Sequence, residues 1–361
     1  MTMATATRAE RLAERLAERE LDSLLVGDLT NVRWLTGFTG TNGMALIGPG
    51  LNLFVTDFRY VEQAEAQVPA SFERALGKAE LAEEAVRRMS GRVGFDDAHV
   101  SVKQFERLRK LAPEGVELVP AAGLVEELRA VKDAVEVEAI RAATALADEV
   151  FAELAERGFV GRTEHEIAVD AEFGFRRRGA SGTSFPPIVA GGPHGALPHA
   201  EPRRVPIEAD TLVVVDMGCV LDGYCSDCTR TFATGESLPE EMRAVYDLVL
   251  RSQLAALDAV RAGRDGKSID SVARDLIAAE GRGDQFGHGL GHGVGLEIHE
   301  APRLSQSAPK TPLLAGEVVT VEPGVYVPGA FGVRIEDLVV VSADGPPAIL
   351  TSFPKDLTVV G

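Results

Sequence analysis

The stretch Thr211–Thr231, TLVVVDMGCVLDGYCSDCTRT, organises the C-terminal part of this chain. Its apolar first half is typical of a buried strand, and Asp222-Gly223 is a turn signal that sends the second half back as a return strand. With a two-residue turn there, Asp216 and Asp227 are diagonal neighbours on one sheet face, roughly 7–8 Å apart. The predicted strands of this β-hairpin are residues 211–220 and 224–231.

Two carboxylates in an apolar hairpin repel each other and lose hydration unless a positive charge lies between them. A divalent metal ion supplies that charge with the oxygen ligands it prefers. A proton shared between Asp216 and Asp227 is the neutral alternative. The hairpin alone leaves both readings open.

Composition restricts the class of protein. The 361 residues suggest two domains, and a net charge of −18 argues against broad nucleic-acid binding and suits a protein that holds cations. The N-terminal run RAERLAERLAERE has no apolar core for a signal peptide, and no run approaches 18 apolar residues. We therefore expect no nucleic-acid partner, no membrane partner and a cytoplasmic location.

All three cysteines, Cys219, Cys225 and Cys228, fall in the hairpin stretch. An odd number in a long chain argues against a disulfide scaffold and favours a reducing compartment. The CxxC of Cys225 and Cys228 is also compatible with a redox site or a zinc knuckle. Without a second CxxC, we interpret these residues as packing thiols.

The first 127 residues alternate helical and strand patterns, which is typical of an α/β domain. The segment 31–43, NVRWLTGFTGTNG, is rich in glycine and threonine. Within it, Gly40–Gly43 is predicted as a loop that packs or lines a cleft, because it lacks both common phosphate-loop spacings. We predict a domain boundary near residue 127. The predicted helices are 4–20, 59–67, 79–89 and 102–111, and the strands are 21–26, 44–47, 51–56, 92–95 and 116–118.

The remainder, residues 128–361, also mixes helices and strands. Thr163 and Glu166 form a capping box for a helix that continues to about Arg178. A Gly/Pro/Ser-rich segment then ends in Pro198-His199. The other predicted helices are 124–158, 239–262 (capped by Ser237) and 268–279, and the strands are 188–190, 318–322, 324–327, 333–336 and 338–341.

A glycine-rich histidine cluster follows, GHGLGHGVGLEIHE at residues 287–300. His288 and His292 have a metal-ligand spacing for a helix, but five glycines make a helix implausible. The glycines indicate backbone that comes close to another group. Together with His299, the cluster therefore indicates a functional loop.

Two further acids lie at the ends of apolar strands. Glu322 precedes Pro323, and Glu336 lies two residues beyond Arg334 on the same predicted face. An internal salt bridge between Glu336 and Arg334 would explain that acid alone. Four carboxylates and a histidine cluster in one domain instead favour two divalent ions, such as Mn²⁺, Co²⁺ or Zn²⁺.

Five segments of residues 128–361 resemble, in order, the ligand blocks of the pita-bread metallopeptidases, which include methionine aminopeptidase, aminopeptidase P and prolidase. They are VVVDMG, GYCSDCTRT, GHGLGHGVGLEIHE, VEPGVYVPG and RIED. WLTGFTGTNG and TDFRYVEQAEAQVP are similar to the small domain of bacterial Xaa-Pro peptidases. The resemblance implies an α/β (α+β) chain, with a creatinase-like α/β domain at residues 1–127 and a pita-bread catalytic domain at 128–361.

The resemblance also implies metal ligands. Asp216 would hold one ion through both oxygens, Asp227 and Glu336 would bridge two ions, and His292 and Glu322 would complete the second ion's shell. It implies roles around the substrate as well, with Glu322 moving a proton. His199 and His299 would stabilise the developing oxyanion, and the implied substrate-side residues are His288, Tyr326 and Arg334.

The implied activity is hydrolysis of the Xaa-Pro bond at the N-terminus of a peptide with proline in second position. We favour the aminopeptidase P type because the sequence shows no extra basic cap near the site; an Xaa-Pro dipeptidase (prolidase) is the alternative. Methionine aminopeptidase fits less well, given His288 and the large N-terminal domain. An inert peptide-binding module of the same fold is the rival of another class, although all five ligands are present.

The same resemblance implies two divalent ions per subunit, with manganese favoured over cobalt or zinc, and a homodimer. Two departures from the family pattern concern pocket shape: His194 stands where a polar residue such as Asn is usual, and Pro186-Pro187 follow Phe185.

Overall fold

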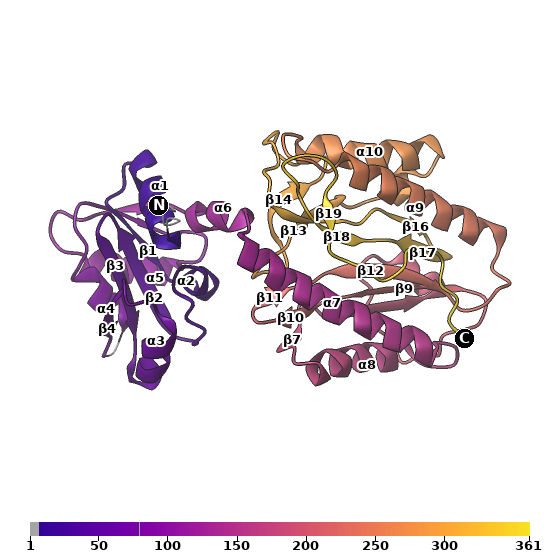
Figure 1. Ribbon diagram of the computed structural model, residues 1–361, viewed down its shortest axis with the longest axis horizontal. Helices are drawn as coiled ribbons and strands as arrows, with labels where there is room; N and C mark the ends of the chain where they lie inside the picture. The colour runs from indigo at the N-terminus through magenta and orange to yellow at the C-terminus, as the bar shows by residue number, and fades with distance from the viewer. Residues whose placement is uncertain (1–6, 79) are drawn as a thin grey trace, which may run out of the picture. The chain divides into compact units, whose positions relative to one another are not determined.

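The computed structural model describes residues 7–78 and 80–361, which form two compact units, residues 1–129 and 130–361 (Figure 1). The predicted helices 4–20 and 79–89 begin at residues outside the described part. Their described portions contain α1 (Arg8–Glu18) and α4 (Leu81–Val86). None of the helices in the described part has the length and apolarity that crossing a membrane requires.

The N-terminal unit is built on a six-stranded sheet in the order β4-β3-β2-β1-β5-β6. All strands run in one direction except β2, which is antiparallel to both of its neighbours. The alternation of strands with helices is the predicted α/β pattern, and it gives a mostly parallel sheet. The strands are β1 (Ser23–Val26), β2 (Gly43–Gly48), β3 (Leu51–Thr56), β4 (Glu73–Leu76), β5 (Arg92–Phe95) and β6 (Glu117–Pro120).

Helices connect these strands, and most match their predicted places. The helix α5 (Val102–Leu111) has its predicted bounds, because Ser101 and Gln104 form a capping box. The others are η1 (Phe58–Tyr60), α3 (Val61–Gln67) and α6 (Leu124–Ala130).

The predicted loop at Gly40–Gly43 is free of helix and leads into β2, but a helix that was not predicted, α2 (Leu29–Thr36), precedes it. Asp28 caps the helix by accepting a hydrogen bond from the Asn31 amide, and Gly37 ends it in a left-handed conformation. The sequence prediction gave weight to the glycines and threonines and missed this pair of caps. Strand β4 was missed as well.

The C-terminal unit packs helices on both sides of its strands. α7 (Ala134–Arg157) and α8 (Glu164–Arg177) lie on one side, and α9 (Glu240–Ala259) and α10 (Gly266–Ala279) on the other (Figure 1). Each helix pair contributes to its own apolar cluster against the strands. The predicted helix 124–158 is interrupted where Asp133 starts a new capping box.

The strands of this unit form several short sheets. One has the order β12-β9-β8, and another β14-β13-β15-β18-β19. The strands are β7 (Gly182–Thr183), β8 (Ile188–Gly191), β9 (Leu212–Met217), β10 (Cys219–Leu221), β11 (Tyr224–Cys225), β12 (Cys228–Ala233), β13 (Gly291–Gly293), β14 (Glu300–Leu304), β15 (Val318–Val321), β16 (Gly324–Val327), β17 (Phe331–Arg334), β18 (Asp337–Val340) and β19 (Ala348–Ile349).

The predicted hairpin of residues 211–231 is present, with each strand divided in two. Asp222 and Gly223 form its turn with positive φ angles of 47° and 81°. Asp216 pairs with Thr229 in the register that a two-residue turn gives. A Cβ at Gly218 would lie 1.9 Å from the Ser226 carbonyl oxygen, so only glycine fits where the strands divide.

One helix cap was predicted wrongly. Ser237 does not cap α9; its amide donates to Asp210, and α9 begins after Pro239 without a side-chain cap. The other predicted helix, 268–279, begins slightly earlier, where Asp265 caps α10 by accepting from the Ser268 amide.

Candidate metal centre

Three carboxylates from different segments converge inside the C-terminal unit. One oxygen each from Asp216, Asp227 and Glu336 lies within 4.8 Å of the others. Asp216 lies on β9, Asp227 precedes β12, and Glu336 lies between β17 and β18. Thr229 ties the segments together, because its carbonyl accepts the Glu336 amide and its hydroxyl donates to a Glu336 oxygen at 2.7 Å.

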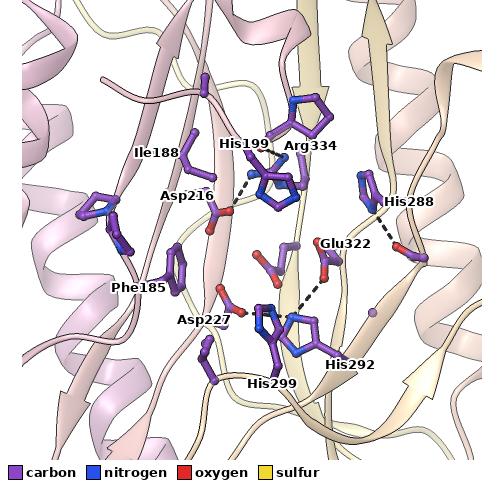
Figure 2. A pocket seen from close by; sticks show the side chains of 18 of the residues that line it. Phe185, Ile188, His199, Asp216, Asp227, His288, His292, His299, Glu322 and Arg334 are labelled. Carbon is purple, nitrogen blue, oxygen red and sulfur yellow. Dashed lines mark hydrogen bonds and ion pairs between the residues drawn. The ribbon is translucent and has the colours of Figure 1, made fainter. Parts of the chain in front are cut away.

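His292 and Glu322 face the same acids from the β13–β15 sheet (Figure 2). His292 Nε2 lies 3.4 Å from Glu322 Oε1 and 3.5 Å from Asp227 Oδ2. The other ring nitrogen, Nδ1, lies 3.1 Å from the Gly293 carbonyl and donates to it. This tautomer leaves the Nε2 lone pair directed at the carboxylates, as in metal-binding histidines.

Without a bound cation, this group of acids cannot be fully charged. Burial raises the pKa of Asp227 well above its usual range, and the Glu336 and Asp216 carboxylates raise it further. Burial likewise raises the pKa of Glu336, and it raises that of Glu322 to about 8. Burial lowers the pKa of His292 to about 4, so its imidazole is neutral and free to act as a ligand.

Arg334 supplies one guanidinium to these acids, and one oxygen of Asp216 has no hydrogen-bond partner among the described residues. Arg334 donates to Asp216 Oδ2 at 2.6 Å. The salt bridge considered from the sequence, between Arg334 and Glu336, is therefore replaced by one to Asp216. Asp216 Oδ1 is buried and has no hydrogen-bond partner within the described residues. A free buried oxygen beside carboxylates and an imidazole fits hard-to-borderline divalent ions.

His288, Tyr326 and Arg334 form a connected chain beside the acids. His288 Nδ1 lies 2.8 Å from the Gly289 carbonyl, and its Nε2 lies 2.9 Å from the Tyr326 hydroxyl. Arg334 donates to the same hydroxyl oxygen at 2.7 Å. The hydroxyl therefore donates to His288 while it accepts from Arg334. Tyr326 lies behind these residues and is not among those that line the cavity.

The acids open into a cavity of about 590 Å³. His199 and His299 both line it, and Figure 2 shows His199 beside Arg334 and His299 beside His292. The rings of His292 and His299 lie 4.4 Å apart, edge to face. Arg334 holds the segment before His199 by donating to the Pro198 carbonyl. The cavity thus collects nine of the ten predicted site residues, with Tyr326 behind them.

Arg303 is a cavity residue that the sequence prediction missed. It lies opposite His292 in the β13–β14 pairing, so both side chains project from the same face. Arg303 lines the cavity, and its side chain has no hydrogen bond or ion pair with any described residue. Its proximity contributes to the lowered pKa values of His292 and His299, after burial. The signal that places Arg303 at the cavity is the pairing of β13 with β14, which the sequence alone did not give.

The two departures at Phe185–Pro187 and His194 lie in different places. Phe185, Pro186 and Pro187 line the cavity. His194 instead faces Glu164, with its Nδ1 2.9 Å from a carboxylate oxygen. The substitution at His194 therefore acts on the support of the loop rather than on the cavity wall.

The cysteines of the hairpin are free and buried, as the packing interpretation predicted. Burial raises the thiol pKa of Cys219 to about 11 and that of Cys225 to about 12. Because their pKa values are raised, both groups are neutral thiols near neutral pH. Since the thiolate is the form that binds metal, this suits packing rather than metal binding.

The chain matches two known protein-family models. The sequence model of metallopeptidase family M24 matches residues 138–343, and that of the creatinase/prolidase N-terminal domain matches residues 8–131. The chain is 34% identical to an Xaa-Pro dipeptidase of Pyrococcus furiosus, over 97% of this chain and 99% of that protein.

Solved structures that cover nearly the whole chain include two with different named activities. An Xaa-Pro dipeptidase from Bacillus anthracis has a TM-score of 0.94 and 36% identity, covering 98% of this chain and 99% of that one. An X-Pro aminopeptidase from Thermotoga maritima has a TM-score of 0.90 and 34% identity, covering 98% and 100%. Both kinds of name therefore occur among similar structures.

Proposed function

The chain belongs to metallopeptidase family M24, and we propose that it is an Xaa-Pro dipeptidase that hydrolyses the bond between the first residue and a C-terminal proline. The single observation that carries this proposal is Arg303, an exposed guanidinium at the cavity without a recorded partner. The carboxylate of an Xaa-Pro dipeptide matches the planar fork of that cation. The Pyrococcus furiosus relative and the Bacillus anthracis structure, both named Xaa-Pro dipeptidase, support the same choice.

We infer that Asp216, Asp227, His292, Glu322 and Glu336 hold two divalent ions, which when bound supply Lewis-acid activation of a water molecule. Glu322 then accepts and returns a proton, because its carboxylate opens onto the cavity beside the other ligands.

His199 and His299 stabilise negative charge on the substrate carbonyl as the bond to proline breaks. Proline has no amide N–H, so the site relies on contacts to the ring and to both charged ends of the dipeptide. His288, Tyr326 and Arg334 support the substrate side of the cavity.

An aminopeptidase P type activity is the second candidate, and it is the one that the sequence alone favoured. The Thermotoga maritima structure, named an X-Pro aminopeptidase, is 34% identical to this chain and supports it. In that case Arg303 would border a longer peptide instead of ending the pocket. The remaining parts of the proposal are manganese as the native metal, a homodimer and a cytoplasmic location.

The test compares Ala-Pro with Ala-Pro-Ala at equal metal loading, in the wild type and in Arg303→Ala. We expect the wild type to favour Ala-Pro by tenfold or more in kcat/KM, about 1.4 kcal/mol in transition-state binding. Arg303→Ala should abolish that preference, and Arg303→Lys should retain part of it. Arg251→Ala, which removes an exposed arginine paired with Glu280, is the matched control.

A wild-type preference for Ala-Pro-Ala would make the chain an aminopeptidase P instead. A preference for Ala-Pro that Arg303→Ala leaves intact would show that another group ends the pocket. Hydrolysis of neither substrate, with no stoichiometric metal, would favour the inert binding module.

A further inference from the structure

A buried carboxylate outside the cavity accepts hydrogen bonds from two segments that border the cavity. Asp270 lies on α10 and is fully buried. Its Oδ1 accepts the Leu290 amide at 3.0 Å, and its Oδ2 accepts the Gln306 side-chain amide. Leu290 belongs to the glycine-rich segment, and Gln306 lies between Ser305 and Ser307, which line the cavity. One side chain thus fastens both segments.

Arg274, one turn further along α10, completes this arrangement. Its Nε and Nη2 donate to the two Asp270 oxygens at 2.8 and 2.9 Å. The remaining donors reach backbone: Nη1 donates to the Phe286 carbonyl at 2.8 Å and Nη2 to the His288 carbonyl at 2.7 Å. The guanidinium also lies over the Phe286 ring, 4.2 Å from its centroid. A planar fork is needed to make all these contacts at once.

The segment held in this way leads directly to the site. The His288 ring meets the Tyr326 hydroxyl, and the Leu290 carbonyl accepts the Glu322 amide at 2.8 Å. Leu290 therefore connects Asp270 on one side with Glu322 on the other. Residues 286–293 contain four glycines, so ordering this backbone costs more conformational entropy than it would for other residues. Fixed contacts such as these offset that cost.

We propose that Asp270 and Arg274 are positioning residues for this site, holding Phe286–Leu290 so that His288 and Glu322 keep their places. Neither side chain lines the cavity, so both act through the segment. Displacements of about 1 Å at a catalytic constellation lower rates by about 10²-fold. The kinetic part of this inference rests on the proposed peptidase function, and the structural part does not.

A purely stabilising ion pair is the competing explanation, and lysine separates the two. Arg274→Lys keeps the charge beside Asp270 but has no fork to reach two carbonyls and a carboxylate together. The matched control is Arg178→Lys. Arg178 donates to Glu149, Glu153 and the Gly174 carbonyl away from the cavity, and its side chain is 29% exposed against 23% for Arg274.

The first measurement is amide hydrogen exchange across Phe286–His292 in the metal-free protein. We expect exchange at Leu290 to become about tenfold faster or more in Arg274→Lys, because its acceptor Asp270 is no longer held. Arg178→Lys should leave this segment unchanged. Unchanged exchange in Arg274→Lys would overturn the proposal, whether or not the protein cleaves any substrate.

The second measurement is kinetic. Arg274→Lys should lower kcat/KM on Ala-Pro by about 10–100-fold at full metal loading, while its melting temperature stays close to that of Arg178→Lys. Asp270→Asn keeps the acceptor for Leu290 but removes the ion pair, and should give a smaller loss in the same direction. Full activity in both Arg274→Lys and Asp270→Asn would contradict the positioning role. A wild type inactive on Ala-Pro would instead count against the proposed function.

Discussion

Glu336 and Asp337 are sequence neighbours whose carboxylates lie in opposite electrostatic surroundings. Glu336 joins Asp216 and Asp227 in the acid group, and burial and its acidic neighbours raise its pKa well above the usual range. Asp337 is just as buried, and burial acts to raise its pKa too, yet Arg230 and Lys355 hold it below the usual range. The difference is the source of the compensating charge.

The Asp337 site is complete within the chain. Its oxygens accept from Arg230 at 3.0 Å, from Lys355 at 2.6 Å, from Gln253 and from Thr351. The acid group at Glu336, together with Glu322, has one guanidinium for four carboxylates. One buried oxygen of the group, Asp216 Oδ1, has no hydrogen-bond partner among the described residues. A buried acid group that its own chain leaves uncompensated indicates a bound cation, whereas a compensated one indicates structure.

Replacement of Asp227 by Asn should have the largest effect. We expect loss of at least one metal ion and a fall in kcat/KM of about 10³-fold or more, because several kcal/mol of catalysis depend on the ions. In the metal-free protein the same change should leave the melting temperature equal or higher, because burial and the neighbouring carboxylates raise the pKa of Asp227 and a neutral amide avoids the cost of charging it there. Elemental analysis, kinetics and thermal melts measure these outcomes. Wild-type metal content with full activity would break the comparison.

Replacement of His299 by Ala tests a cavity residue beside the acids. We expect kcat to fall about 10²–10³-fold with normal metal content, because the proposed role of His299 is to stabilise the developing oxyanion. His292→Ala should instead lose metal, since His292 directs Nε2 at the acids. Equal metal loss in both variants would show that these two roles are wrongly assigned.

Replacement of Asp337 by Asn tests the compensated site. It leaves buried Arg230 without its carboxylate, so we expect the free energy of unfolding to fall by about 3 kcal/mol. Urea unfolding of the metal-free and metal-loaded proteins measures this. The loss should be similar in both, in contrast to Asp227→Asn. A change below about 0.5 kcal/mol would show that this ion pair contributes little.

The pH dependence of the metal-free protein is the smallest predicted effect. The folded-state pKa of Glu322, about 8, lies above the usual unfolded value near 4.3, so the folded state retains a proton that the unfolded state releases. Stability from this group is present below pH 4.3 and is lost as pH rises toward 8.

His288 and His292 act in the opposite direction at lower pH, because burial lowers both pKa values to about 4. They favour unfolding below pH 6.5, so the acid effect is clearest between pH 6.5 and 8. There the metal-free protein should lose about 1.4 kcal/mol per pH unit for each proton released. Chemical unfolding with and without metal measures it. Equal slopes would contradict the raised pKa.

Local sequence signals predicted much of this structure. The Asp222-Gly223 turn and the two-residue side-chain period of strands gave the register of Asp216, and the Thr163 capping box gave the start of α8. Buried acids and clustered histidines indicated the site for the same reason, since both are unusual in apolar segments.

Interactions between distant segments could not be predicted in this way. The partner of Arg334 is Asp216, 118 positions away, rather than nearby Glu336. Arg303 faces the cavity only because β13 pairs with β14, and Asp270 reaches Leu290 only because α10 packs there. Each depends on tertiary contacts, for which one sequence carries no periodic signal.

The central claim is that a bound divalent ion supplies the positive charge that the acid group lacks. The most direct test is to measure metal content and activity on the same protein. Protein purified without added metal should contain divalent ions, approaching two per chain when loaded, and should hydrolyse an Xaa-Pro substrate. Exhaustive chelation should abolish hydrolysis and lower the melting temperature, and readdition of a divalent ion should restore both. Full Xaa-Pro hydrolysis by protein without detectable metal would contradict the account.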